Sequence, residues 1–207
     1  MTKERILFYP AWIRIWHIVN AVSCLFLIVT GLSMQYSNPT NPLIDFNTSV
    51  AMHNSAGIVL SVNYLIFLIG NWITPNGNHY KIQRKGFMNR LLNQFTYYSF
   101  SIFKGASAPY PINRERKFNP LQQFSYVFVM YIVLPLMFIT GFALLFPGVV
   151  VNPFLGNNGL FVTDLLHVIA GFVVSLFLII HVYFCTIGYT PLSHFKAMIT
   201  GYHEVHE

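Results

Sequence analysis

The chain has 207 residues, of which 55% are hydrophobic and only 9% are charged. About a quarter of the residues in a soluble domain are charged, so this composition excludes an ordinary soluble domain and indicates a membrane protein. The formal net charge of +6 does not indicate a nucleic-acid-binding protein, because the basic residues lie in separate loops between apolar segments rather than in one patch.

Four segments are apolar and long enough to cross a bilayer as helices, which takes about 20 residues each. They are residues 11–34, 48–73, 121–146 and 160–188. The third segment contains Pro135 and Gly141, which predict a kink without a break. The expected fold class is therefore all-α, an integral membrane four-helix bundle, with residues 1–207 as a single domain.

The sequence contains no pattern that indicates signal-peptide cleavage or disulfide formation. The N-terminus lacks a short apolar stretch followed by a small-residue cleavage site, so we expect the first segment to be retained. Cys24 and Cys185 both lie inside apolar segments, and no CxxC or CxxCH pattern is present. The sequence therefore predicts neither a disulfide framework nor covalent haem attachment, and we expect both cysteines to be small buried apolar side chains.

The positions of the Lys and Arg residues predict the orientation of the four helices. Of the twelve, three precede or begin the first segment, eight lie between the second and third, and one follows the fourth. The other two connections contain none. By the positive-inside rule, both termini and the long middle connection lie in the cytoplasm, with the chain in the bacterial inner membrane.

The connections differ in character. Residues 84–104 of the middle connection mix Phe, Leu and Tyr with basic residues, which predicts an amphipathic helix on the inner membrane surface. After Gly105, where Pro109 and Pro111 occur, an irregular solvated loop is an equal alternative. The two outer connections are short and rich in Asn, Pro and Gly, which leaves the outer helix ends accessible to another protein.

Four of the eight histidines lie inside the apolar segments, namely His17, His53, His167 and His181. The topology places His17 near the inner side and His53 near the outer side. On the fourth segment, His167 is outer and His181 is inner. These two are fourteen residues apart, so they project from nearly the same helix face, about 21 Å apart along the axis. The sequence therefore predicts two cofactors at different depths, with His17 paired with His181 and His53 paired with His167.

Paired imidazoles from different helices suit an iron porphyrin used for electron transfer, because filling both axial positions leaves no open site for oxygen. A porphyrin is bulky, so small residues are expected beside its ligands. Gly57 and Gly171 follow the two outer histidines in a shared H-x-x-A-G pattern, and Gly31 lies fourteen residues after His17. We therefore expect these three glycines to help bind the cofactors.

Other roles for these residues are open. Each embedded histidine, taken alone, fits equally an interior residue that hydrogen-bonds a neighbouring helix. Zinc is disfavoured because it needs three or four protein ligands at one point. A haem-free transporter or scaffold is a further alternative, although transporters usually embed acidic residues and only Asp164 comes close. Arg14, one turn before His17, fits either a partner of a haem propionate or a positive-inside anchor.

The remaining histidines lie outside the segments, on the cytoplasmic side: His79, His194, His203 and His206. The C-terminal sequence GYHEVHE contains two of them and is capable of binding a metal ion. A frayed terminus is the expectation for this stretch.

The third segment begins with KFNPLQQFSY at the inner membrane boundary. Asn119 precedes Pro120, which fits a helix N-cap with proline at the first helical position. Alternatively, Asn119 or Gln122 hydrogen-bonds a quinone carbonyl beside the inner haem. This boundary offers both hydrogen-bond donors and a proton path to water, as a quinone headgroup requires.

At these residues the sequence resembles the four-helix di-haem b-type cytochrome subunits of bacterial respiratory oxidoreductases, such as thiosulfate reductase, formate dehydrogenase and nickel–iron hydrogenase. The similar stretches are RIWHIVNA, KFNPLQQFSY, HVIAGF with HVYF, and FKAMITGY, so the resemblance extends over nearly the whole chain. It implies two haem b groups ligated by the histidine pairs given above. It also implies a quinone near the inner haem, with an Asn at the position of Asn119.

We therefore expect a membrane subunit that relays electrons between a redox partner and the quinone pool. The partner is a periplasmic or membrane-bound iron–sulfur or multihaem protein, and the quinone is menaquinone or ubiquinone. The redox reaction of the quinone would be the only catalytic step of the subunit. The alternative within electron transfer is a stand-alone di-haem cytochrome that passes electrons between quinone and a small oxidant such as superoxide.

Overall fold

The computed structural model describes residues 3–36, 38, 40, 42–113, 116–150, 158–188 and 190–206. Four helical segments have the length and apolar composition to span a bilayer: α1 (Ala11–Gln35), α2 (Phe46–Ile73), the segment Pro120–Leu145, and α6 (Gly159–Cys185). The predicted all-α membrane bundle is confirmed, and each span begins and ends within three residues of its predicted bounds. The fourth differs most, because its helix ends at Cys185 rather than at Gly188.

The spans bury several polar side chains and expose many apolar ones. Exposed apolar residues include Ile139, Phe172 and Ile179. In a bilayer such surfaces contact lipid, so the polar groups of a span turn toward neighbouring helices. The buried polar residues of the spans are Ser23, Thr30, Ser33, Ser49, Asn63, Asn76 just beyond α2, and Thr140.

Polar caps start three of the spans. The side chain of Asp45 accepts a hydrogen bond from the Thr48 backbone N–H at 3.0 Å at the start of α2. Asn158 accepts from the backbone N–H groups of Leu160 and Phe161 at the start of α6. Asn119 caps α4 (Pro120–Phe128), as its position before Pro120 predicts. Each cap satisfies N–H groups that a helix start leaves without a partner.

The third span is continuous but irregular. It consists of α4, a π-helical turn η4 (Val129–Val133) and α5 (Leu134–Leu145). Pro135 follows the turn and has no N–H, so in the i→i−5 pattern the Met130 carbonyl loses its donor. The Tyr64 hydroxyl of α2 supplies one, at 2.8 Å. The irregularity expected near Pro135 is therefore a π turn whose free carbonyl bonds a neighbouring helix.

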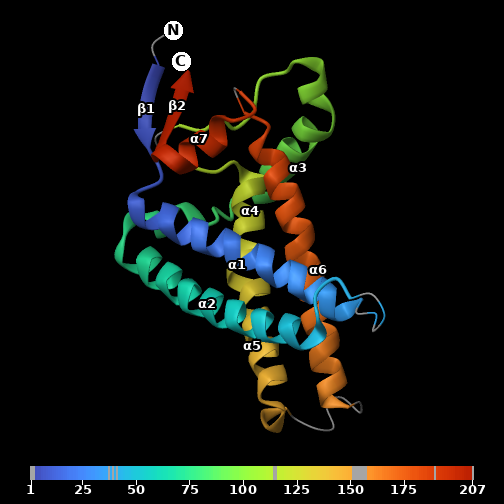
Figure 1. Ribbon diagram of the computed structural model, residues 1–207. Helices are drawn as coiled ribbons and strands as arrows, with labels where there is room; N and C mark the ends of the chain where they lie inside the picture. The colour runs from blue at the N-terminus through green and yellow to red at the C-terminus, as the bar shows by residue number, and fades with distance from the viewer. Residues whose placement is uncertain are drawn as a thin grey trace.

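Two helix layers cross in the molecule. Figure 1 shows α1 and α2 side by side, crossing the layer formed by α4, α5 and α6. The core lies where the layers meet and includes Trp16, Phe67, Val129 and Leu134. The Trp16 ring stacks on Phe67 with 4.6 Å between ring centroids. This packing places the start of α1, including the position of His17, against the other layer.

The helices α1 and α2 approach closely at Gly70, because glycine has no side chain to keep them apart. A Cβ atom on Gly70 would lie 2.6 Å from the Trp12 ring. One turn away, the Trp16 Nε1–H donates to the Asn63 carbonyl at 3.0 Å, and the Asn63 amide donates back to the Trp16 carbonyl at 3.1 Å. These reciprocal bonds fix the register of the two helices.

The cytoplasmic end carries the remaining elements. The middle connection forms η1 (Pro75–Tyr80), the amphipathic helix α3 (Phe87–Thr96), a π turn η2 (Tyr97–Ser101) and a 3-10 turn η3 (Ile102–Lys104). After Gly105 the described residues are irregular apart from one bridge, between Asn113 and Arg116. A surface helix over residues 84–104 followed by an irregular stretch agrees with the sequence pattern.

The two ends of the chain pair with each other. Strand β1 (Lys3–Leu7) lies antiparallel to β2 (Tyr202–His206), with Leu7 opposite Tyr202. The short helix α7 (Ser193–Thr200) precedes β2, and Figure 1 shows the two strands side by side next to it. The expectation of a frayed C-terminus is wrong for Tyr202–His206, because these residues pair through the backbone with the N-terminal strand, and Glu207 lies outside the described residues.

Substitution of Tyr64 by Phe should destabilise the protein by about 1–3 kcal/mol, because it leaves the buried Met130 carbonyl without a donor. The shift of the thermal unfolding midpoint in detergent measures this effect. In a Pro135→Ala background the backbone N–H returns, so the same substitution should destabilise less. An equal destabilisation in both backgrounds would contradict this account.

Candidate functional site

The outer histidine pair joins α2 to α6. The rings of His53 and His167 have centroids 6.3 Å apart and planes inclined at 69°. Two imidazoles bound to opposite sides of one metal ion, at metal–nitrogen distances of about 2 Å, have centroids about 6 Å apart. The outer pair therefore has the separation of two axial ligands on one ion.

The inner pair joins α1 to α6 with nearly the same separation. The ring centroids of His17 and His181 are 6.2 Å apart, with planes at 52°. Phe177 stacks on His181 at 5.6 Å, and the Tyr126 hydroxyl lies 3.4 Å from the His181 Nδ1. The Cys185 Sγ lies 3.9 Å from the Nε2 of the same ring. The structure thus brings the four embedded histidines together in the two pairs that the topology predicts.

The donor set fits a metalloporphyrin better than a bare ion. Among the described residues, no group of three or more His, Cys, Asp or Glu side chains converges on one point. A porphyrin supplies four nitrogen ligands of its own, so two axial imidazoles complete the coordination of its iron. The residues present at each pair therefore suit a haem iron, and ligation by these four histidines stays a prediction.

Of the three glycines predicted to help bind the cofactors, one lies against a histidine and two do not. A Cβ atom on Gly31 would lie 3.5 Å from the His53 Cε1. A Cβ atom on Gly57 or Gly171 would meet only Leu27 or Met137, in each case at 3.9 Å. Gly31 thus lies against His53 of the outer pair, whereas the glycines of the H-x-x-A-G patterns lie at ordinary helix contacts.

Three residues against the outer pair were not predicted. The Thr30 and Thr140 hydroxyls lie 3.0 and 2.9 Å from the Nδ1 atoms of His53 and His167, respectively. A Cβ atom on Gly141 would lie 3.2 Å from the His167 Cε1. The available sequence signal is a repeated Thr-Gly dipeptide, Thr30–Gly31 and Thr140–Gly141, on the span before each H-x-x-A-G pattern.

Arg14 connects α1 to the C-terminal end of the chain. Its Nη1 donates to the Ile199 carbonyl in the last turn of α7. A cation near the C-terminus of a helix interacts favourably with the free carbonyls there. Its Nε is buried and has no hydrogen-bond partner among the described residues. The contact with Ile199 anchors Arg14 to α7. The interaction of Arg14 with a haem propionate stays a prediction, and its Nε is the atom that has no other partner among the described residues.

Asn119 is a buried structural residue. Its Oδ1 accepts from the Gln122 N–H at 2.9 Å, and the Gln122 Oε1 accepts from the Asn119 N–H at 3.2 Å, which together form a capping box. The Asn119 amide also donates to the Tyr98 hydroxyl at 2.9 Å. The capping box uses only the carbonyl oxygen of Gln122 and leaves its NH₂ group as a donor.

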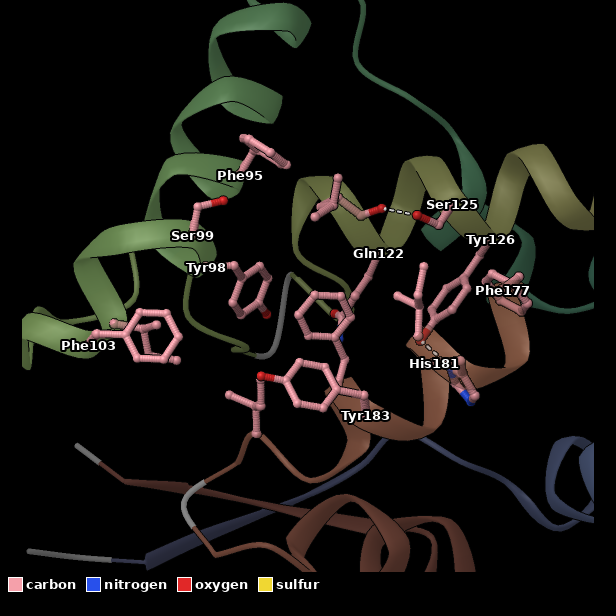
Figure 2. A pocket seen from close by; sticks show the side chains of 15 residues that line it. Phe95, Tyr98, Ser99, Phe103, Gln122, Ser125, Tyr126, Phe177, His181 and Tyr183 are labelled. Atoms are coloured by element: carbon pink, nitrogen blue, oxygen red, sulfur yellow. Dashed lines mark hydrogen bonds between the residues drawn. The ribbon is translucent and has the colours of Figure 1, made fainter. Parts of the chain in front are cut away.

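A pocket of about 650 Å³ lies beside His181, between the surface helix, α4 and α6. Figure 2 shows Tyr98, Gln122, Tyr126 and Tyr183 around it, with His181 at one side. Most of the lining is apolar, with Phe95, Phe103, Phe177 and Phe184 among the residues that form it. Burial raises the pKa of Tyr98, so its hydroxyl keeps its proton at neutral pH. Asn119 does not line the pocket and reaches it through Tyr98.

Replacing Gly141 by Ala should lower the haem content of the purified protein, because the new Cβ displaces the His167 ring. Gly171→Ala is a matched control on the facing helix, since its Cβ has room at 3.9 Å. The pyridine haemochrome assay measures haem per chain in both variants. If Gly171→Ala loses haem and Gly141→Ala does not, the macrocycle lies against the glycine that the H-x-x-A-G pattern predicts.

Comparison with known proteins identifies relatives of this chain. The model of the prokaryotic cytochrome b561 family matches residues 8–201. The putative cytochrome YdhU of Escherichia coli K12 is 36% identical over 200 residues, covering 97% of this chain and 75% of that protein. No solved structure matches the chain.

Two hydrogenase subunits are also similar. A probable Ni/Fe-hydrogenase B-type cytochrome subunit of Bradyrhizobium diazoefficiens is 30% identical over 156 residues, 68% of this chain and 58% of that protein. Its counterpart from Cupriavidus necator is 25% identical over 145 residues, 66% of this chain and 57% of that protein. This chain therefore spans less than two thirds of the length of either hydrogenase subunit. From the match over residues 8–201, the chain belongs to the prokaryotic cytochrome b561 family and is a multi-pass b-type cytochrome of the bacterial inner membrane.

Proposed function

We propose that this cytochrome carries electrons across the inner membrane through two haem b groups, between a redox partner on the periplasmic side and the quinone pool. The observation that supports this most directly is the pair of cross-helix imidazole contacts. Each has the centroid separation of two axial ligands, 6.3 Å at the outer level and 6.2 Å at the inner level. Haem iron with both axial positions filled exchanges electrons without an open site for oxygen.

The helix α6 connects the two levels. His167 and His181 lie fourteen residues apart on it, about 21 Å along the axis. Each takes its partner from a different helix, His53 from α2 and His17 from α1. Ligation at both levels would therefore tie α6 to both members of the crossing layer. The role of the protein is to hold each ligand pair and to exclude water between the levels.

The partner is proposed from the relatives. Two of them are named as B-type cytochrome subunits of hydrogenases. We propose that this chain is likewise a module of an oxidoreductase complex, with an iron–sulfur or multihaem subunit docked at the outer helix ends. This analogy favours a subunit over the stand-alone quinone–superoxide cytochrome.

The quinone is proposed to bind in the pocket beside His181. Its volume of about 650 Å³ lies within the roughly 300–1,000 Å³ usual for small-molecule sites. The Tyr98 hydroxyl and the Gln122 NH₂ group are protonated donors at its wall, suited to the two carbonyls of a quinone. Asn119 then acts indirectly, because its amide holds the Tyr98 hydroxyl at 2.9 Å.

The purified protein should contain two haem b groups per chain, with low-spin optical spectra. His17→Ala should remove the inner component and His53→Ala the outer component, because each substitution leaves one iron with a single axial ligand. Pyridine haemochrome and redox-resolved spectra measure both effects. One haem per chain, or loss of the same component in both variants, would refute the pairing.

Replacing Tyr98 by Phe should slow haem reduction by a quinol analogue several-fold, since the pocket loses a donor. Tyr97→Phe is the matched control, because Tyr97 is the neighbouring residue and does not line the pocket. Reduction by dithionite should be unchanged in both variants, which shows that the haems are intact. If Asn119 acts through Tyr98, Asn119→Ala should add little to Tyr98→Phe. Wild-type quinol reactivity in both Tyr98→Phe and Gln122→Leu would exclude the pocket as the quinone site.

A further inference from the structure

Both outer histidines contact a threonine hydroxyl from the neighbouring helix of their own layer. His53 contacts Thr30 of α1, and His167 contacts Thr140 of α5. The two threonines are 0% and 4% exposed, so water does not compete for these contacts. The same arrangement thus occurs twice, on two pairs of helices that are separate in the sequence.

The hydrogen atoms of these contacts can be assigned from the remaining partners. The Thr30 hydroxyl lies 2.7 Å from the Phe26 carbonyl, and the Thr140 hydroxyl lies 2.8 Å from the Leu136 carbonyl. A carbonyl oxygen only accepts, and a hydroxyl has a single hydrogen to donate. Each hydroxyl therefore donates to its own helix and presents a lone pair to the histidine.

It follows that the Nδ1 atom of each outer histidine carries the proton and donates it to the threonine. In a neutral imidazole with a protonated Nδ1, the Nε2 lone pair is free. The tautomer that exposes Nε2 to a metal is therefore selected at both outer ligands.

Among the described residues, no threonine hydroxyl hydrogen-bonds a histidine of the inner pair. The Nδ1 of His181 has the Tyr126 hydroxyl at 3.4 Å, which is long for a hydrogen bond. A phenol hydroxyl is also free to donate or accept, so it selects no tautomer. The threonine contacts consequently distinguish the outer pair from the inner pair.

We propose that Thr30 and Thr140 are positioning residues for the outer haem, which set the tautomer and the ring rotation of His53 and His167. This inference rests on the proposed bis-histidine ligation. A hydrogen bond from the far nitrogen of a metal-bound imidazole fixes its orientation and raises its basicity. The more basic ligand stabilises ferric iron, so the two threonines lower the midpoint potential of the outer haem relative to ligands without such a partner.

The test uses the detergent-purified holoprotein with Thr140→Val, Thr140→Ser and the corresponding variants of Thr30. Two readouts are the EPR g values of the low-spin ferric haems, which respond to the orientation of the imidazole planes, and the midpoint potential of each haem. The valine variants should shift the g values of the outer haem and raise its potential. The serine variants should keep both near wild-type, because serine retains the acceptor oxygen.

The matched control is Thr163→Val on α6. The Thr163 hydroxyl donates to the Gly159 carbonyl at 2.8 Å, as the two outer threonines donate to their own helices, but among the described residues it makes no hydrogen bond to a histidine ring. It should leave both haem signals unchanged. Loss of the outer haem in a valine variant, with retention in the serine variant, counts as the same positive result.

Several outcomes would overturn the inference. Wild-type g values and potentials in the valine variants would do so, as would equal changes at both haems or loss of the outer haem in serine and valine variants alike. Failure of the proposed function is recognised separately. In that case the wild-type protein itself lacks a second haem, or its outer component survives substitution of His53.

Discussion

An imidazole inside a membrane span needs partners for both nitrogens, because the surrounding hydrocarbon provides none. The fold gathers these imidazoles around α6, whose two histidines each face a histidine of another helix. The outer pair also uses the Nδ1 edge of each ring for a threonine contact. The crossing of the two helix layers is the arrangement that brings these side chains together at two depths.

The two levels differ in what surrounds them, and the difference matches the division of function proposed for them. The outer histidines contact buried hydroxyls and lie against Gly31 and Gly141, a setting that restricts the orientation of their rings. His181 of the inner pair borders a pocket with tyrosine and glutamine side chains at its wall. A rigid outer site suits electron transfer alone, whereas an inner site open to a polar pocket suits electron transfer coupled to a quinone.

Much of this arrangement is predictable because membrane spans obey simple constraints. The length of an apolar segment predicts each helix, and basic loops predict orientation, so the depth of each embedded histidine follows. Side-chain contacts follow less directly. Gly57 and Gly171 share a pattern with the histidines yet pack on Leu27 and Met137, because a glycine four residues along a helix need not face the same neighbour. The pairing of β1 with β2 joins the two ends of the chain, and no local pattern predicts such a distant contact.

The four spans, their orientation and the depth of four histidines are predicted from the amino-acid sequence alone, because these predictions need only hydrocarbon thickness, charge and helical rise. Only the tertiary structure decided which side chains contact those histidines. Thr30 and Thr140 are ordinary span residues in the sequence, and they become histidine partners because α1 packs on α2 and α5 packs on α6 at one particular rotation. Helix rotation depends on the packing of many side chains at once, such as Trp12 against Gly70. It therefore belongs to the folded bundle rather than to any single segment.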